Sequence, residues 1–176
     1  MKTTAFFTRI LGWLTGSRLT VDNSVVSGLD PACLVGNAGD PARLAGSWYE
    51  IARFDHFFER GMTHTKANYV IRDDGKIDVI NTGIKNGKPK TAKGIAKLTD
   101  TPALLRVSFF GPFYSDYRIM LLDADYQYML IGSGSDGYLW ILSRTPRLSE
   151  EAKTEILSEA RRRGYDTDRL IWVKQE

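Results

Sequence analysis

The stretch GSWYEIARFDHFFERG, which runs from residue 46 to residue 61, decides how the chain is expected to fold. It opens with a glycine shortly before Trp48, and the residues up to Phe54 have the aromatic and aliphatic content of a strand. Two further phenylalanines, Phe57 and Phe58, fall in a polar segment that ends in Glu-Arg-Gly. This stretch predicts a strand that begins beside a large indole and leads into an aromatic loop.

Downstream of Trp48 the chain breaks into short apolar or alternating runs that are separated by turn residues such as Asn86-Gly87. An antiparallel meander of eight strands most simply closes into an up-and-down barrel, because closure removes both exposed sheet edges. We therefore predict an all-β fold with strands at residues 48–54, 65–72, 76–84, 90–98, 104–110, 117–122, 126–132 and 138–143.

Helical periodicity begins only near the C-terminus. Ser149 is suited to cap a helix, because glutamates follow it in the first turn. Ala152, Ile156 and Ala160 form an apolar stripe that needs a surface to cover, and Gly164 is placed to end the helix. The sequence thus predicts one C-terminal α-helix that packs on the barrel, followed by a short final strand at residues 170–173.

The composition is that of a folded globular chain. Of its 176 residues, 43% are hydrophobic and 26% are charged, which is enough apolar material for one core. The net charge is only +3 and the basic residues are scattered, so we predict no nucleic-acid surface. Cys33 is the single cysteine, and therefore no internal disulfide can form.

The N-terminal part divides into two segments ahead of a domain at residues 44–176. On a helix, Phe6, Ile10, Trp13 and Leu14 of residues 1–18 would share one face, which suits a helix lying in a membrane surface. A degenerate leader, or a helix packed on the barrel, is the alternative reading. Residues 19–43 are rich in glycine and proline and predict an irregular linker.

Several motifs, which follow one another in the expected order along the chain, resemble the lipocalin family. Gly46-Ser47-Trp48 is similar to the Gly-x-Trp signature of the first strand, and Arg144 after YLWILS stands where the family has the arginine of its last strand. LLDADYQYMLI resembles the middle motif. WYEIARFDHFFERG, RDDGKIDVIN and VSFFGPFY are similar to the branch of bacterial outer-membrane lipocalins and apolipoprotein D. The resemblance covers residues 44 to 175.

The resemblance implies that the two ends of the barrel differ. Trp48 would plug the closed end, with Arg144 across its indole face and Gly46 giving the entering chain room to turn. Phe57 and Phe58 would belong to a long loop over the open end. There they would form a gate for apolar ligands, or simply cover the rim.

The resemblance also implies a small hydrophobic ligand, such as a fatty acid or lysophospholipid, carried without catalysis. A head group would need polar partners, for which Tyr69, Asn81 and Tyr117 are inward candidates, although a neighbouring strand could equally satisfy them. The expected cavity residues are Phe54, Tyr69, Val79, Asn81, Leu105, Val107, Phe109, Tyr117, Ile119, Leu121, Tyr138, Trp140 and Leu142.

Other chemistries find little support in the residues. Gly132-Ser133-Gly134-Ser135-Asp136-Gly137 fits G-x-G-x-x-G, but the segment after it reads as a strand, so we predict a hairpin turn. His56 and His64 lack a third ligand nearby, and we interpret them as ordinary loop histidines. We predict no metal, no cofactor and no catalytic residues.

Several alternatives stay open. A pigment or tetrapyrrole binder would give His56 or His64 a role, and an enzyme acting on a lipid or isoprenoid could use the same cavity. The family branch implies the cell envelope, yet Asp30 shortly before Cys33 does not fit a lipoprotein signal, so a soluble or membrane-peripheral protein is the other reading. Any membrane contact would then come from residues 1–18. We expect a monomer or a homodimer.

Overall fold

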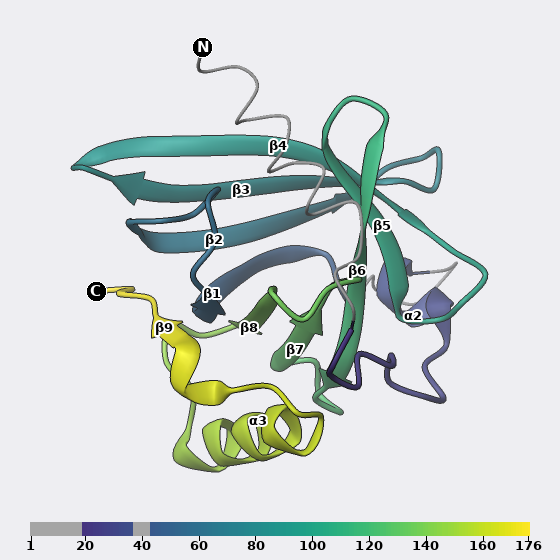
Figure 1. The fold of residues 1–176 in the computed structure, drawn as a ribbon. Coiled ribbons are helices and arrows are strands. Elements are labelled where there is room, and N and C mark those ends of the chain that lie inside the picture. The colour runs from purple at the N-terminus through teal and green to yellow at the C-terminus, as the bar shows by residue number, and fades with distance from the viewer. Residues whose placement is uncertain (1–18, 37–42) are drawn as a thin grey trace.

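The computed structural model describes residues 19–36 and 43–176, which form a closed antiparallel barrel (Figure 1). Each strand pairs with the next along the chain, and β1 pairs with both β8 and β2 to close the sheet. The eight-stranded up-and-down barrel predicted from the sequence is therefore confirmed. Its strands are β1 (Gly46–Phe54), β2 (Met62–Ile71), β3 (Ile77–Lys85), β4 (Lys88–Leu98), β5 (Leu104–Phe110), β6 (Phe113–Leu122), β7 (Tyr128–Gly132) and β8 (Leu139–Ser143).

Turn chemistry fixes the register of the hairpins. Asn86 and Gly87 both adopt positive φ angles, of 52° and 71°, and they join β3 to β4 where Lys85 faces Lys88. Two left-handed residues in a two-residue loop match the natural twist of the flanking strands. The strand pair β3–β4 is consequently long and regular, and it forms one wall of the barrel.

The barrel wall is not paired along its full height between β4 and β5. Their ladder extends only from Ile95 to Leu98, so residues 88–94 of β4 pair with β3 alone. Gly94 lies where the two strands begin to separate, and a Cβ atom there would be 2.6 Å from the carbonyl oxygen of Ser108. Only glycine permits this approach, and above it the β5–β6 hairpin stands away from β4 (Figure 1).

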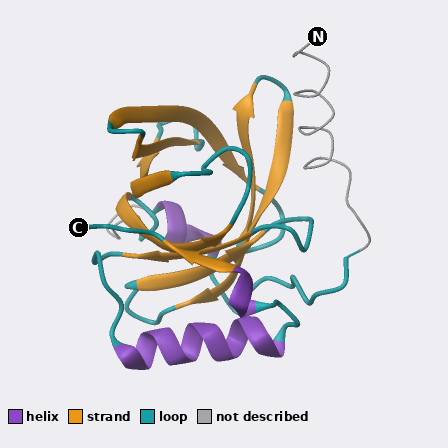
Figure 2. Ribbon diagram, turned by 60° about the vertical axis from the view of Figure 1, so that its left-hand side comes forward, coloured by secondary structure: helices purple, strands orange, loops and turns teal. Residues whose placement is uncertain are grey.

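The C-terminal helix covers one outer side of the barrel (Figure 2). Helix α3 (Glu150–Arg162) is capped by the Ser149 hydroxyl, which accepts a hydrogen bond from the Ala152 amide, and Gly164 follows its end at a φ of 92°. Its buried residues Ala152, Ile156 and Ala160 are the stripe that the sequence predicted. A 3-10 turn, η1 (Thr167–Arg169), then leads into β9 (Leu170–Trp172), which pairs with β1.

Two hydrophobic clusters stabilise the fold. One fills the barrel interior near Trp48 and includes residues from most of the strands. The other lies outside the barrel, between α3 and the outward faces of β1, β6, β7 and β8. Side chains of these strands therefore contribute to opposite clusters in alternation, as expected of a sheet that is covered on both faces.

Residues 19–36 are more than the irregular linker that the sequence predicted. The short helix α2 (Pro31–Val35) begins after Asp30, whose carboxylate accepts a hydrogen bond from the Ala32 amide, and proline occupies its first turn. Leu34 is only 1% exposed and belongs to the interior cluster. Cys33 lies in α2, while the amphipathic segment proposed at residues 1–18 lies outside the described residues.

One end of the barrel is closed by a stacked pair. The indole of Trp48 is fully buried, and its ring nitrogen donates a hydrogen bond to the Leu44 carbonyl oxygen at 2.9 Å. The guanidinium of Arg144 lies 3.8 Å from the centre of the indole ring and donates to the carbonyl oxygens of Ser47 and Arg43. Gly46 turns beneath it at a φ of 89°. The arrangement expected from the sequence for Gly46, Trp48 and Arg144 is present.

Arg144→Ala should destabilise the protein without weakening ligand binding. The substitution removes a cation over an aromatic ring and two hydrogen bonds to carbonyl groups, so we expect the free energy of unfolding to fall by about 2 kcal/mol. Urea denaturation measures the loss, and Arg147→Ala, at an exposed arginine of the following loop, is the control. Unchanged stability would refute the role assigned to this pair.

Candidate functional site

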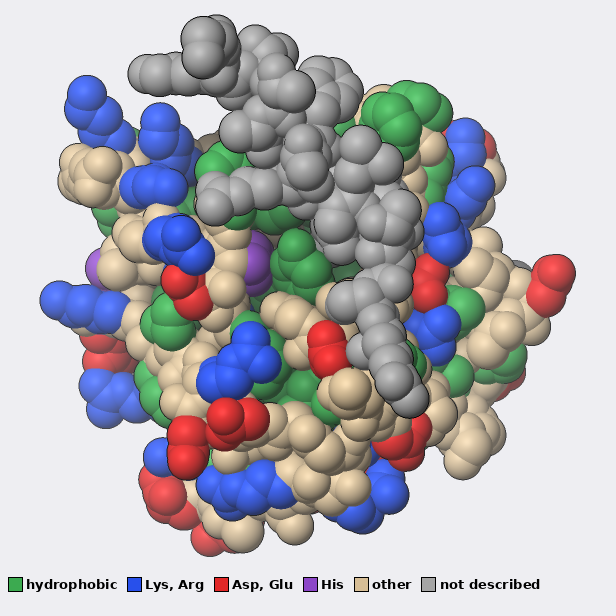
Figure 3. All heavy atoms as spheres, viewed as in Figure 1, with side chains coloured by type: hydrophobic (Ala, Val, Ile, Leu, Met, Phe, Trp, Pro, Cys, Tyr) green, Lys and Arg blue, Asp and Glu red, His purple; other side chains and the backbone are tan. Residues whose placement is uncertain are grey.

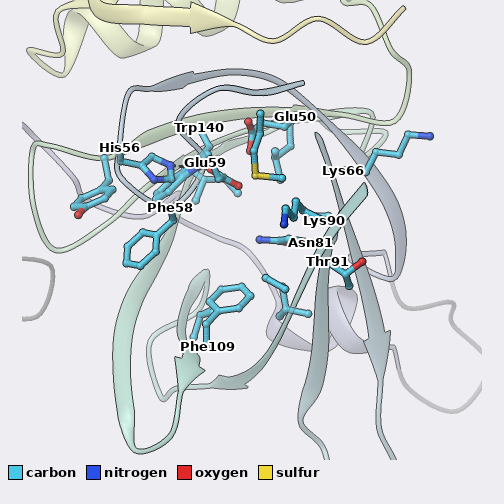
Figure 4. A pocket seen from close by; sticks show the side chains of 18 of the residues that line it. Glu50, His56, Phe58, Glu59, Lys66, Asn81, Lys90, Thr91, Phe109 and Trp140 are labelled. Atoms are coloured by element: carbon cyan, nitrogen blue, oxygen red, sulfur yellow. Dashed lines mark hydrogen bonds and ion pairs between the residues drawn. The ribbon is translucent and has the colours of Figure 1, made fainter. Parts of the chain in front are cut away.

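The barrel encloses a cavity of about 690 Å³ in the half that lies away from Trp48, and it opens at that end. Figure 4 shows side chains that line it. Its walls are mostly apolar, and strands β1 to β8 all contribute or border it. Most of the residues predicted to line a cavity do so: Tyr69, Val79, Asn81, Val107, Phe109, Tyr117, Tyr138, Trp140 and Leu142. Large apolar residues at alternate positions of a barrel strand point to the same side, which is why the sequence indicated them.

Leu105 and Ile119 were also expected in the lining, but they belong to the floor below the cavity. Both are at most 1% exposed and pack in the interior cluster around Trp48. Alternation assigned them to the correct side of the sheet, since both point inward. It carries no information on depth along the barrel axis, and the lower half of the barrel is filled by side chains.

Phe54 and Leu121 were predicted to line the cavity and instead lie outside the barrel, in the cluster under α3. Each follows a β-bulge. In β1 the pairing passes from Glu50 to Ala52, and in β6 it passes from Ile119 to Leu121. One extra residue reverses the inward and outward positions beyond it, so both predictions were wrong for the same reason. Phe54 packs against Tyr165, with ring centres 6.1 Å apart.

The loop at residues 55–61 borders the mouth. Phe58 lines the cavity, whereas Phe57 is 43% exposed on the rim, with its ring centre 5.6 Å from that of Phe58. The two phenylalanines thus take different positions in the mouth loop that the sequence assigned them to.

A buried ionic cluster forms the β1 side of the cavity, and the sequence analysis did not predict it. The guanidinium of Arg53 is 2.6 Å from a carboxylate oxygen of Glu50 and donates to the carbonyl oxygens of Glu59 and Met62. Arg53 is 1% exposed and Glu50 is 4% exposed. Because the β1 bulge turns Arg53 inward, the cluster ties the strand to the start of β2 across the mouth loop.

Glu59 joins this cluster to the aromatic wall. Its carboxylate lies 2.7 Å from the His56 imidazole and accepts a hydrogen bond from the Trp140 indole nitrogen at 3.1 Å (Figure 4). The His56 ring also packs against Tyr138 and Trp140. His56 is therefore a buried residue of the site rather than an ordinary loop histidine. His64 lies on β2, beside the Thr63 hydroxyl, and does not line the cavity.

The carboxyl groups of Glu50 and Glu59 differ in the direction of their pKa shifts. Burial raises the pKa of the Glu50 carboxyl well above its ordinary value, and the negative charge of Glu59 raises it further, against the opposing effect of Arg53. Burial would also raise the pKa of Glu59. Hydrogen bonds from His56 and Trp140, together with the nearby positive charges, nevertheless hold it below its ordinary value. The geometry thus favours a proton on Glu50 and a negative charge on Glu59.

The β3–β4 wall contributes an amide and an ammonium group to the cavity, in contrast to the carboxylates on the β1 side. Asn81 and Lys90 point into the cavity next to each other (Figure 4). Lys90 faces Gly83 across the strand pair, and the Met62 side chain lies over that glycine. The side-chain amide oxygen of Asn81 (Oδ1) is buried, and within the described part of the chain it accepts no hydrogen bond. Tyr69 and Tyr117, by contrast, satisfy each other, since their hydroxyl oxygens are 2.8 Å apart.

The remaining sequence motifs do not form a site. The segment at residues 132–137 is the β7–β8 turn, in which the Ser133 hydroxyl donates to the Ser135 carbonyl oxygen, and a strand follows it as predicted. Among residues 19–36 and 43–176, no group of three potential metal ligands comes together. None of the helices described there has the length and apolar content to cross a bilayer.

Comparison with known proteins adds independent support. A model of the lipocalin-like domain matches residues 40–175. The chain is 48% identical over 143 residues to the Escherichia coli K12 protein named outer membrane lipoprotein Blc, covering 79% of this chain and 81% of that one. It is 31% identical over 147 residues to mouse apolipoprotein D, covering 77% of each. Lobster apocrustacyanin A1 shares the fold, with a TM-score of 0.67 at 18% identity over 93% of this chain and 91% of that chain.

Glu59→Gln should lower stability in a pH-dependent manner. Because the folded-state pKa of Glu59 is depressed, its contribution is present above the ordinary value of 4.5 and is lost as the pH falls through the folded pKa. We expect a loss of about 1–3 kcal/mol in the free energy of unfolding at pH 7, which disappears in acid. Urea titrations across this range measure it, with the exposed Asp100→Asn as control. A difference that does not vary with pH would contradict the assignment.

Proposed function

Because the chain belongs to the lipocalin family, whose members bind small hydrophobic ligands, we propose that it carries a single-chain amphiphile in the barrel cavity. A fatty acid or a lysophospholipid is the class that we propose. The protein would act as a carrier in membrane lipid storage, transport or repair, and not as a catalyst.

The observation that carries this proposal is the one-ended cavity. Its volume of about 690 Å³ lies within the range of roughly 300–1,000 Å³ that is usual for small-molecule sites. Trp48 and the packed floor below Leu142 leave the mouth as the wide entrance. An acyl chain placed against these apolar walls would gain about 0.8 kcal/mol for each methylene that leaves water.

The distribution of polar groups supports an amphiphile over a plain hydrocarbon. Asn81 and Lys90 on one wall, and Glu50 and Glu59 on the other, lie above the apolar floor. A head group held between these walls could accept from the Lys90 ammonium and donate to the buried Asn81 oxygen. The tail would then point toward Trp48. This orientation follows from the positions of the polar groups alone.

The relatives support a place in the cell envelope, since the Escherichia coli protein is named as an outer membrane lipoprotein. We propose the same compartment for this chain. The segment at residues 1–18, which could contact a membrane, lies outside the described residues.

The pigment-binding alternative receives no support from the histidines. His56 is within 2.7 Å of the Glu59 carboxylate and is enclosed by aromatic rings, while His64 does not line the cavity. The enzymatic alternative has no specific observation in its favour either. A carrier is therefore the function that we propose.

Native mass spectrometry tests the proposal directly. The protein purified without detergent should retain an acyl-chain species that delipidation removes, and the delipidated protein should bind palmitic acid or lysophosphatidylcholine. Quenching of tryptophan fluorescence reports binding, because one of the four indoles, that of Trp140, lines the cavity. If neither probe binds, the carrier proposal is refuted.

Ala92→Trp should block the cavity. Ala92 lies on the cavity side of β4, is exposed, and faces Asn81, so an indole can enter the empty volume without disturbing the packed floor. We expect affinity for palmitic acid to fall by at least about tenfold, equivalent to roughly 1.4 kcal/mol, with the melting temperature unchanged. Lys93→Trp, the next residue on the outer face, is the matched control. Equal effects of both substitutions would show that the fatty acid binds elsewhere.

A further inference from the structure

The tip of the β5–β6 hairpin presents two phenylalanines to solvent. Phe110 and Phe113 face each other across the turn, and they are 39% and 46% exposed. The Ser108 hydroxyl donates to the Gly111 carbonyl oxygen and accepts from the Phe110 amide, which fixes the shape of the tip. Figure 3 shows hydrophobic side chains gathered at the tip of this hairpin. Their exposure is therefore built into an ordered turn.

The hairpin tip is continuous with the mouth loop. The ring centre of Phe58 lies 5.9 Å from that of Phe110 and 5.6 Å from that of Phe57, which is 43% exposed. Ile84, at the end of β3, adds another exposed apolar side chain at the same end of the barrel. Phe58 and Phe110 also line the cavity, so the exposed apolar residues at this end are continuous with the ligand entrance.

The same rim carries positive charge. Lys85, Lys88 and Lys90 stand at and beside the β3–β4 turn, and no described carboxylate lies within ion-pair distance of any of them. On the mouth loop, by contrast, Asp55 is neutralised by Arg60 at 2.8 Å. Basic side chains also appear along the edge where β3 and β4 end (Figure 3). The rim thus combines protruding aromatic residues with uncompensated cations.

We propose that the open end of the barrel is a docking surface for an anionic lipid bilayer. Phe110 and Phe113 would enter the boundary between head groups and acyl chains, while the lysines meet the anionic head groups. The exposed apolar side chains stand on separate elements, the β5–β6 hairpin and the mouth loop, beside the opening of the cavity. This suits a deformable lipid surface better than the flat face of a protein partner, which would need a continuous contact area.

Docking in this orientation places the cavity mouth against the bilayer. A lipid could then move between bilayer and cavity without crossing bulk water, a consequence that rests on the proposed function. The docking itself depends only on the rim, so the two proposals can fail separately. This surface is also different from the N-terminal segment that the sequence suggested for membrane contact.

Co-sedimentation of the full chain with vesicles tests the docking surface. We expect binding to vesicles that contain phosphatidylglycerol and weaker binding to pure phosphatidylcholine. Phe113→Ser should lower the partition coefficient by about tenfold, because a phenylalanine side chain no longer leaves water. Lys88→Gln should lower it by about fivefold on phosphatidylglycerol vesicles only.

Matched controls lie at the closed end of the barrel. Val70→Ser removes an apolar side chain that is 44% exposed on β2, and Lys76→Gln removes an exposed lysine near the β2–β3 turn. Neither should change vesicle binding. If Phe113→Ser binds vesicles like the unaltered protein, or if Val70→Ser loses as much as Phe113→Ser, the docking surface is wrongly placed.

A second measurement separates docking from ligand binding. Phe113 does not line the cavity, so Phe113→Ser should bind palmitic acid in solution as the unaltered protein does. Phe113→Trp should gain an emission that brominated acyl chains in the vesicles quench, whereas Val70→Trp should not. Absence of quenching at position 113 would overturn the proposal, even if palmitic acid binds normally.

Discussion

The contact between Arg144 and Trp48 makes the two ends of the barrel different, and the rest of the site depends on that difference. A guanidinium 3.8 Å from the indole centre, anchored to the carbonyl oxygens of Ser47 and Arg43, covers the closed end from outside. Inside it, a layer of side chains with almost no exposure fills the lower half of the barrel. The cavity therefore begins above a rigid floor, and only the loops of the opposite end border its entrance. A binding site with a fixed depth is the result.

Sequence patterns predicted the fold well because strands and turns leave local signals. Alternation indicated the inward positions of β3, β5 and β8, and Asn86-Gly87 marked a hairpin that the structure contains. The bulges at Ile51 and Met120 leave no such signal, since an extra residue in a strand looks like any other apolar residue. This is why Phe54 and Leu121 were assigned to the wrong side. Glu50 could have been found, because it lies two residues after Trp48 and so points inward.

The ionic cluster at the mouth loop is costly to bury, and its arrangement explains how it is tolerated. Arg53 pairs with Glu50 and also donates to two carbonyl oxygens where the loop meets β2, while the Glu59 carboxylate contacts His56 and accepts a hydrogen bond from Trp140. The cluster thus fixes the path of the mouth loop from inside the barrel. It also brings charge to the upper wall of an otherwise apolar cavity. Stability of the loop and polarity of the site are in this way set by the same group of side chains.

The incomplete ladder between β4 and β5 has a consequence for self-association. Residues 88–94 leave backbone donors and acceptors along one strand edge without a β5 partner, and such edges can recruit the same strand of another copy. Here the edge carries Lys88, Lys90 and Lys93, and Pro89 contributes no amide hydrogen. Two such edges would repel each other on approach. The lysines therefore protect this unpaired edge of the barrel from pairing with the same edge of a second copy.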